Sequence, residues 1–252
     1  MTHVCAYYIP SKIKLGTMMT GIIYRHPSIL AKIAATLDVL TKGRLFMGIG
    51  AAWNEEESLA YGISFPSTKE RLSRLEEAIQ IIRKMWTEEP SASFNGRYYQ
   101  IKNAYCNPQP IQNPSPPIMI GGGGERHTLR IVAKYADACN LFGSVETVKR
   151  KLSILKEHCT SVGRDYESIL KTKLGIVVID DDKETARKRL QQISRIPEEQ
   201  INEFGIYGAP EDVLREKESL QDAGIQYLIV DLDPSRELEA LDIFAKEIIR
   251  KS

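Results

Sequence analysis

Apolar residues follow two spacings along the chain, and together these predict parallel strands separated by helices. Short uninterrupted apolar runs are typical of strands that are buried on both faces. Between these runs, apolar positions recur every three or four residues, as they do in helices with one buried face. Alternating strands and helices favour an α/β fold around one parallel sheet. The six predicted strands lie at 15–20, 44–50, 117–121, 138–143, 170–179 and 225–232.

Three of the predicted helices begin with a recognisable signal. Pro27 stands at an early helical position, where its missing N–H costs nothing. Ser67 and Glu70 have the spacing of a capping box and precede a long apolar stripe. Pro210 is followed by two acids, which favour the first turn of a helix. The signals therefore predict helix starts at these three places.

The stretch 87–117 interrupts the alternation of strands and helices. It holds six prolines and an Asn95-Gly96 pair, which predicts a hairpin between Ser93-Phe94 and Tyr98-Tyr99. No shift in composition marks a domain boundary on either side of it. We therefore predict a single domain over residues 1–252, from which 87–117 is an excursion.

A run of four glycines, Gly121 to Gly124, follows the predicted strand 117–121 and precedes a predicted helix. Backbone N–H groups at the start of a helix, and the positive end of its dipole, attract phosphate. The spacing fits neither the dinucleotide fingerprint nor the P-loop. We predict that Gly121, Gly122, Gly123, Gly124 and Arg126 bind a phosphate-bearing cofactor. A mobile turn that binds nothing is the alternative.

Composition and charge narrow the class of protein. The chain is 42% hydrophobic, enough for a sizeable core, and its net charge is +1. Basic and acidic residues are interspersed, which argues against nucleic acid or an anionic membrane as partner. The four cysteines form no C-x-x-C pair, and the sequence has no signal peptide or membrane-spanning run, so we expect a cytoplasmic protein. The four histidines lack metal-ligand spacing, so we expect no metal site.

Several motifs occur in an order that resembles a known family. They are LGTMMTGIIYRHPSILAKIAATLDVLTKGRLFMGIGAAWNEEE, EEAIQIIRKMWTEEP, NGRYYQI, NPQPIQNPSPPIMIGGGG and YADACN. With them the chain resembles the bacterial-luciferase-like superfamily, and within it the deazaflavin oxidoreductases that use coenzyme F420. The resemblance implies a (β/α)₈ TIM barrel, a homodimer, and FMN or coenzyme F420 bound at the carboxyl ends of the strands. Relatives carry further βα units before Lys14, so we expect a barrel that lacks the first one or two.

The resemblance also suggests where the cofactor ring lies. Thr20, Gly21 and Ile22 match the place where deazaflavin relatives carry a bulge with a non-prolyl cis peptide behind the ring, and we predict that bond between Gly21 and Ile22. An ordinary turn glycine is the alternative. Gly143, the last residue of the predicted strand 138–143, completes the predicted cofactor-binding set.

Three residues are the catalytic candidates. His26 titrates near neutrality and suits contact with the ring or proton handling, although packing at a helix start is the favoured alternative. Trp53 and Asn54 follow the strand 44–50, at the catalytic face of a barrel. The most similar deazaflavin dehydrogenases place an acid where Trp53 stands, which argues against sugar-phosphate dehydrogenase chemistry.

The expected function is hydride transfer between coenzyme F420 and a small organic substrate. The first alternative is an FMN-dependent monooxygenase that a flavin or F420 reductase supplies with reduced cofactor. The second is a non-catalytic flavin-binding or dimer-forming remnant. The sequence does not identify the substrate.

Overall fold

The computed structural model describes residues 12–194, 196–232 and 237–249, and the chain divides into two compact units. The first unit comprises Met1–Gly121 and Arg126–Ala138. The second comprises Gly122–Glu125 and Cys139–Ser252. Each unit holds parallel strands together with helices, so the predicted α/β class is confirmed. The prediction of a single domain stays a prediction.

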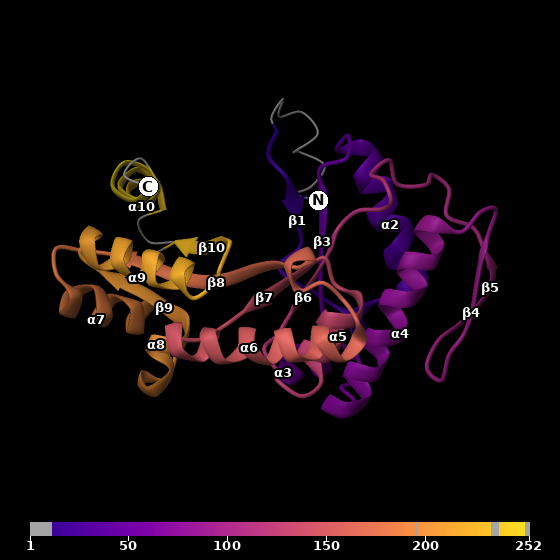
Figure 1. The fold of residues 1–252 in the computed structure, drawn as a ribbon, viewed down its shortest axis with the longest axis horizontal. Coiled ribbons are helices and arrows are strands. Elements are labelled where there is room, and N and C mark those ends of the chain that lie inside the picture. Colours follow the sequence, from indigo (N-terminus) through magenta and orange to yellow (C-terminus); the bar gives the residue numbers. More distant parts are fainter. Residues whose placement is uncertain (1–11, 195, 233–236, 250–252) are drawn as a thin grey trace. The chain divides into compact units, whose positions relative to one another are not determined.

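Parallel strands form the centre of the first unit (Figure 1). β3 pairs with β1, β2 and β6, and Met47 of β3 lies opposite Ile118 of β6. Apart from Phe46, every residue of β3 is buried, as its uninterrupted apolar run predicts. The strands are β1 (Leu15–Gly16), β2 (Thr20–Gly21), β3 (Leu45–Gly50) and β6 (Ile118–Gly121).

The predicted strand 15–20 is divided into β1 and β2 by a bulge at residues 17–19. The Thr17 hydroxyl donates a 2.6 Å hydrogen bond to the carbonyl of Gly48 in β3. A Cβ atom on Gly48 would lie 1.9 Å from the Thr17 carbonyl oxygen and 2.8 Å from the Met19 sulfur. The bulge therefore fits against β3 only because Gly48 has no side chain.

The helices of the first unit begin where their capping residues predict. α2 starts at Pro27, and its N-cap is His26. The Ser67 hydroxyl accepts the Glu70 N–H at the start of α4, which is one half of a capping box. α2 and α4 lie side by side, and the Trp86 indole donates to the Ala31 carbonyl at 3.0 Å (Figure 1). The helices are α2 (Pro27–Leu40), α3 (Glu55–Ala60), α4 (Thr68–Thr87) and α5 (Thr128–Tyr135), with a 3-10 turn at Ile22–Tyr24.

The predicted hairpin is present, with a longer turn than the sequence indicates. β4 (Ala92–Asn95) and β5 (Gln100–Ala104) are antiparallel, so the turn includes Tyr98 and Tyr99 instead of ending before them. The Glu77 carboxylate of α4 accepts the N–H groups of Arg97, Tyr98 and Tyr99 at 2.9–3.0 Å. Three bonds to one charged acceptor hold the longer turn, and a local sequence pattern cannot reveal that tertiary contact.

β8 is the central strand of the second unit. It pairs in parallel with β9 and β10, and its other neighbour in the sheet is β7. The strands are β7 (Ala138–Leu141), β8 (Leu170–Ile179), β9 (Gly205–Gly208) and β10 (Tyr227–Leu232). The sequence analysis missed β9, because Gly205 and Gly208 leave only two residues with side chains in a strand that is defined by pairing with the end of β8.

Helices pack against this second set of strands (Figure 1). Val178, Ala186, Leu190 and Ile201 form a buried cluster among β8, α7 and α8. The helices are α6 (Val145–Val162), α7 (Lys183–Ser194), α8 (Ile201–Phe204), α9 (Pro210–Asp222) and α10 (Glu237–Ile243), followed by a π-helical segment at Phe244–Ile249. Among the described residues, no helix is both long and apolar enough to cross a membrane.

Candidate functional site

The predicted ring-binding residues of the first unit gather at the carboxyl ends of its strands. Thr20 and Gly21 pair with Ile49 and Gly50 at the end of β3. A Cβ atom on Gly21 would lie 2.7 Å from the Tyr24 ring, so that ring fills the space which Gly21 leaves. Ile22 is buried. Contact of these residues with a cofactor ring stays a prediction.

The predicted cis peptide between Gly21 and Ile22 is wrong. The non-prolyl cis bond lies between Met18 and Met19, and Gly21 has an ordinary extended backbone (φ −77°, ψ 131°). A Cβ atom on Gly121 would lie 2.6 Å from Met19 Cγ. The Met19 side chain of the bulge therefore packs against both β3 and β6, at Gly48 and Gly121. The residues around Gly21 alone could not indicate where the cis bond lies, because these contacts come from distant parts of the sequence.

His26 caps the amino end of α2. Its Nδ1 accepts the Ser28 N–H at 3.3 Å and lies 2.8 Å from the Ser28 hydroxyl. Its ring packs edge-on against Tyr99, with centroids 5.3 Å apart, and burial lowers the pKa of the imidazole. The observed contacts are those of a residue that packs at a helix start. A cavity of about 180 Å³ beside it is lined by Ile23, Arg25, His26, Ser64, Pro66, Arg74 and Tyr99.

Trp53 and Asn54 lie beyond the carboxyl end of β3, as predicted, but their side chains have different surroundings. The Asn54 Oδ1 accepts the Glu57 N–H at 3.0 Å and so caps α3. The Trp53 side chain is 86% exposed. In the described residues of the first unit, Asn54 thus has a capping role and Trp53 is available for contact. A catalytic role of either residue stays a prediction.

The glycine loop of the second unit has one position that requires glycine. Gly122 has φ +121°, a conformation that residues with a Cβ rarely adopt, and its N–H donates to the Asn140 carbonyl at 3.2 Å. The N–H groups of Gly123 and Gly124 form no hydrogen bond within the described part of the chain. The N–H groups of Gly123 and Gly124 are therefore available to an anion, whereas that of Gly122 is not.

The other predicted cofactor residues lie on either side of this loop in the sequence. Gly143 has φ +141°, and its N–H donates to the Glu203 carbonyl at 2.9 Å. Arg126 is exposed and belongs to the first unit. α5 begins at Thr128, so Arg126 lies between the glycine loop and the helix. A role for either residue in binding phosphate is therefore untested.

Lys151 of α6 lies against the glycine loop, and the sequence analysis missed it. Its Nζ donates to the Phe142 carbonyl at 2.7 Å. A Cβ atom on Gly123 would lie 2.7 Å from the same Nζ. Burial lowers the pKa of the Lys151 ammonium. Nothing near Lys151 in the sequence marks it, because charged residues at its spacing are common on the exposed face of a helix.

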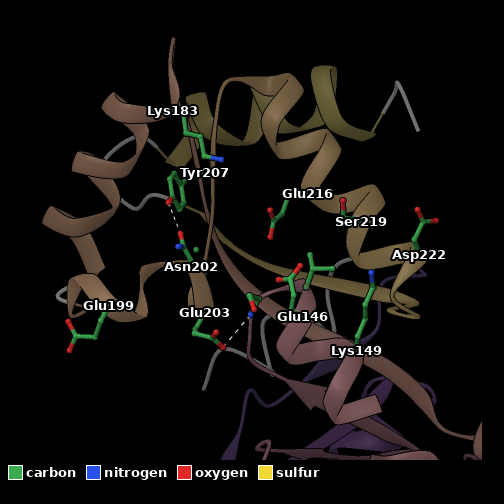
Figure 2. Close-up of a pocket in the computed structure, with 13 residues that line it drawn as sticks. Glu146, Lys149, Lys183, Glu199, Asn202, Glu203, Tyr207, Glu216, Ser219 and Asp222 are labelled. Carbon is green, nitrogen blue, oxygen red and sulfur yellow. Dashed lines mark hydrogen bonds between the residues drawn. The ribbon is translucent and has the colours of Figure 1, made fainter. Parts of the chain in front are cut away.

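A polar cavity of about 750 Å³ opens among the helices of the second unit (Figure 2). Its lining residues come from α6, α7, α8, β9 and α9, and Glu216 points into it from α9. The Tyr207 hydroxyl donates to Asn202 Oδ1 at 2.7 Å. None of the predicted site residues lines this cavity, so cavity size and the predicted chemistry disagree. The free N–H donors of Gly123 and Gly124 match a specific ligand group, phosphate, which makes the glycine loop the better candidate site.

Lys173 of β8 is the second basic residue that the sequence analysis missed. Its side chain is only 1% exposed, and its Nζ lies 3.4 Å from the Leu174 carbonyl, a weak contact. Burial lowers the pKa of Lys173 to about 8, against the opposing effect of Glu216. Burial likewise raises the pKa of Glu216. The only signal for Lys173 in the sequence is a lysine within a strand whose second half, Leu174–Ile179, is apolar.

Comparison with known proteins gives matches to one group. The sequence model of the family described as luciferase-like monooxygenase matches residues 6–230. An F420-dependent glucose-6-phosphate dehydrogenase of Kineococcus radiotolerans is 37% identical over 127 residues, which is 50% of this chain and 35% of the relative. The chain thus matches only about a third of that relative's length.

Two solved structures have a similar fold. The coenzyme F420-dependent tetrahydromethanopterin reductase of Methanopyrus kandleri has a TM-score of 0.83 at 22% identity, over 99% of this chain and 86% of the other. The oxygenating constituent of 3,6-diketocamphane monooxygenase from Pseudomonas putida, in complex with FMN, has a TM-score of 0.72 at 19% identity, over 96% and 80%. At these identities the likeness concerns the fold alone.

Proposed function

Because this chain belongs to the luciferase-like monooxygenase family and has that family's TIM-barrel-type α/β fold, we propose that it is an oxidoreductase that binds a phosphate-bearing deazaflavin through its glycine loop. The proposed reaction is hydride transfer between coenzyme F420 and a small organic substrate. The observation that carries the proposal is the pair of free N–H groups at Gly123 and Gly124, next to the ammonium of Lys151.

The loop fits a phosphate group in both shape and charge. Gly123 carries no side chain that would keep an anion away from the backbone. Two backbone donors and a nearby ammonium suit the oxygens of a phosphate, since charge-assisted hydrogen bonds are the stronger kind. When bound, the deazaflavin ring would supply the hydride chemistry, and the protein would supply binding and orientation. Gly123, Gly124 and Lys151 are the residues that would hold the phosphate.

An FMN-dependent monooxygenase is the second candidate function. The description of the matching family, luciferase-like monooxygenase, is the observation that favours it. FMN also carries a terminal phosphate, so the glycine loop alone does not distinguish the two cofactors. In this case a separate reductase would supply the reduced flavin.

Titration of the purified chain with coenzyme F420 and with FMN, each followed by quenching of cofactor fluorescence, tests the proposal. We expect saturable quenching by protein, with coenzyme F420 bound more tightly than FMN. Gly123→Val should weaken binding of either cofactor by about tenfold or more, because the branched side chain would occupy the space between the loop and Lys151. Circular dichroism and a thermal melt check that this variant is folded.

The possible results separate the candidates. Tighter binding of FMN would favour the monooxygenase. Absence of quenching with both cofactors would reject the proposed function. Unchanged affinity in a folded Gly123→Val protein would reject the glycine loop as the binding site, even if the wild type binds.

A further inference from the structure

Resting on the proposed function, we propose that Lys151 recognises the cofactor phosphate and makes the second unit select a phosphorylated flavin or deazaflavin over the same ring without phosphate. Neither the family match nor the sequence analysis assigns this residue a role. Lys151 thus determines specificity for a phosphate-bearing ligand, because its ammonium contacts the phosphate end of the ligand and not the reacting ring.

The position of the Lys151 ammonium is well defined. Nζ donates to the Phe142 carbonyl at 2.7 Å, which leaves two of its three N–H donors for another acceptor. The absence of a Cβ on Gly123 makes room for Nζ beside the loop. The ammonium and the free N–H groups of Gly123 and Gly124 thus belong to neighbouring segments of one compact unit.

Lys151 has no carboxylate of its own. Within the described residues, no carboxylate oxygen lies within the 4.0 Å of a salt bridge to its Nζ. The two acids that favour its charged form have other donors: Glu125 pairs with Arg150 at 3.0 Å, and Glu203 accepts the Thr147 hydroxyl at 3.1 Å. A half-buried ammonium without a counter-ion is costly, and a bound phosphate would offset that cost.

A purely structural role for Lys151 is the competing explanation. The bond to Phe142 connects α6 to the segment after β7, and its loss could loosen the loop without any contact between Lys151 and phosphate. Such loosening would weaken phosphorylated and unphosphorylated ligands alike. A direct role would weaken only the ligand that carries the phosphate.

The test compares FMN with riboflavin, which has the same ring and no phosphate, by fluorescence quenching on four proteins. They are the wild type, Lys151→Met, Lys151→Arg and Lys149→Met, the last a control on the same helix whose lysine is exposed. We expect Lys151→Met to weaken FMN binding by about tenfold or more and riboflavin binding by less than about twofold. Lys151→Arg should keep most of the preference for FMN, and Lys149→Met should match the wild type.

The results decide between direct recognition of phosphate by Lys151 and a purely structural role. Equal weakening of FMN and riboflavin in Lys151→Met would assign Lys151 a structural role and overturn the inference, as would an unchanged preference for FMN. Both results leave the proposed function standing, because the wild type still binds flavin. If the wild type binds neither flavin nor coenzyme F420, the proposed function and this inference fail together. Coenzyme F420, a phosphodiester, is titrated in parallel to show whether the preference extends to a phosphate with a single negative charge.

Discussion

Lys173 and Lys171 occupy buried positions on the same face of β8, yet their surroundings differ. Lys171 pairs with Glu167 at 2.8 Å and lies 4.1 Å from the centre of the Tyr166 ring. Lys173 has no such partner within the described residues. Lys171 and Lys173 thus lie on the same face of one strand, but only the charge of Lys171 is compensated by a partner. The two charges therefore have opposite effects on the stability of the fold.

We expect Lys173→Met to stabilise the protein and Lys171→Met to destabilise it. Removing the uncompensated ammonium should raise the free energy of unfolding by about 1–3 kcal/mol, since methionine fills a similar volume. Removing Lys171 leaves the Tyr166 ring and Glu167 without their cation. Urea denaturation of both variants measures the difference. A less stable Lys173→Met protein with a native circular dichroism spectrum would contradict the assignment of Lys173 as uncompensated.

The pH dependence of the same variant gives a second measurement. The pKa of Lys173 is lowered to about 8 in the folded protein, from 10.5 in the unfolded chain. The unfolded state therefore binds more protons between these values, and the contribution of Lys173 to stability rises with pH across that window. Burial raises the pKa of Cys139 to about 11, which acts in the opposite direction. The gain from Lys173→Met should accordingly shrink between pH 8 and pH 10.5.

Among the elements of the fold, β3 packs directly against the bulge at residues 17–19, and the contact is made at Gly48. Gly48 and Gly50 lie on the same strand and differ in what a side chain would meet. A Cβ on Gly48 would lie 1.9 Å from the Thr17 carbonyl oxygen, whereas a Cβ on Gly50 would meet nothing closer than 3.7 Å. The contact between β3 and the bulge, and not a property of the strand itself, requires glycine at 48.

We expect Gly48→Ala to lower the free energy of unfolding by about 1–3 kcal/mol or more, because the backbone of the bulge must move. Gly50→Ala, the matched control, should change it by less than about 0.5 kcal/mol. Thermal melts followed by circular dichroism compare the two. Equal melting temperatures would mean that the bulge adapts freely and is not held by its contact with β3.

At the scale of the whole molecule, the resemblance to luciferase-like proteins predicts a homodimer. Large apolar side chains are exposed in both units, among them Trp53 at 86% and Leu238 at 84%. A net charge of only +1 would not oppose association by repulsion. We propose a dimer in solution, and expect sedimentation velocity to show a species of twice the 28.4 kDa chain mass. A single species of one chain mass at every protein concentration would refute this.

Local patterns of residues were enough to predict the parallel α/β organisation, the long strands β3 and β8, and the helix starts at Pro27, Thr68 and Pro210. These features depend on local periodicity and on capping residues, which act within a few positions of the chain. The sequence also placed the glycine loop between a strand and a helix. The glycine loop is the part of the candidate site that could be predicted from the sequence.

Packing between segments that are far apart in the sequence determines which groups surround that loop and where the bulge lies. The cis bond lies at Met18–Met19, and Gly48 and Gly121, far apart in sequence, both leave room for the Met19 side chain. The Gly122 N–H donates a hydrogen bond to the Asn140 carbonyl, and Lys151 of α6 lies against Gly123. These contacts join residues from 18 positions apart (Gly122 and Asn140) to 102 positions apart (Met19 and Gly121), and their distances depend on packing, which no local pattern of residues encodes.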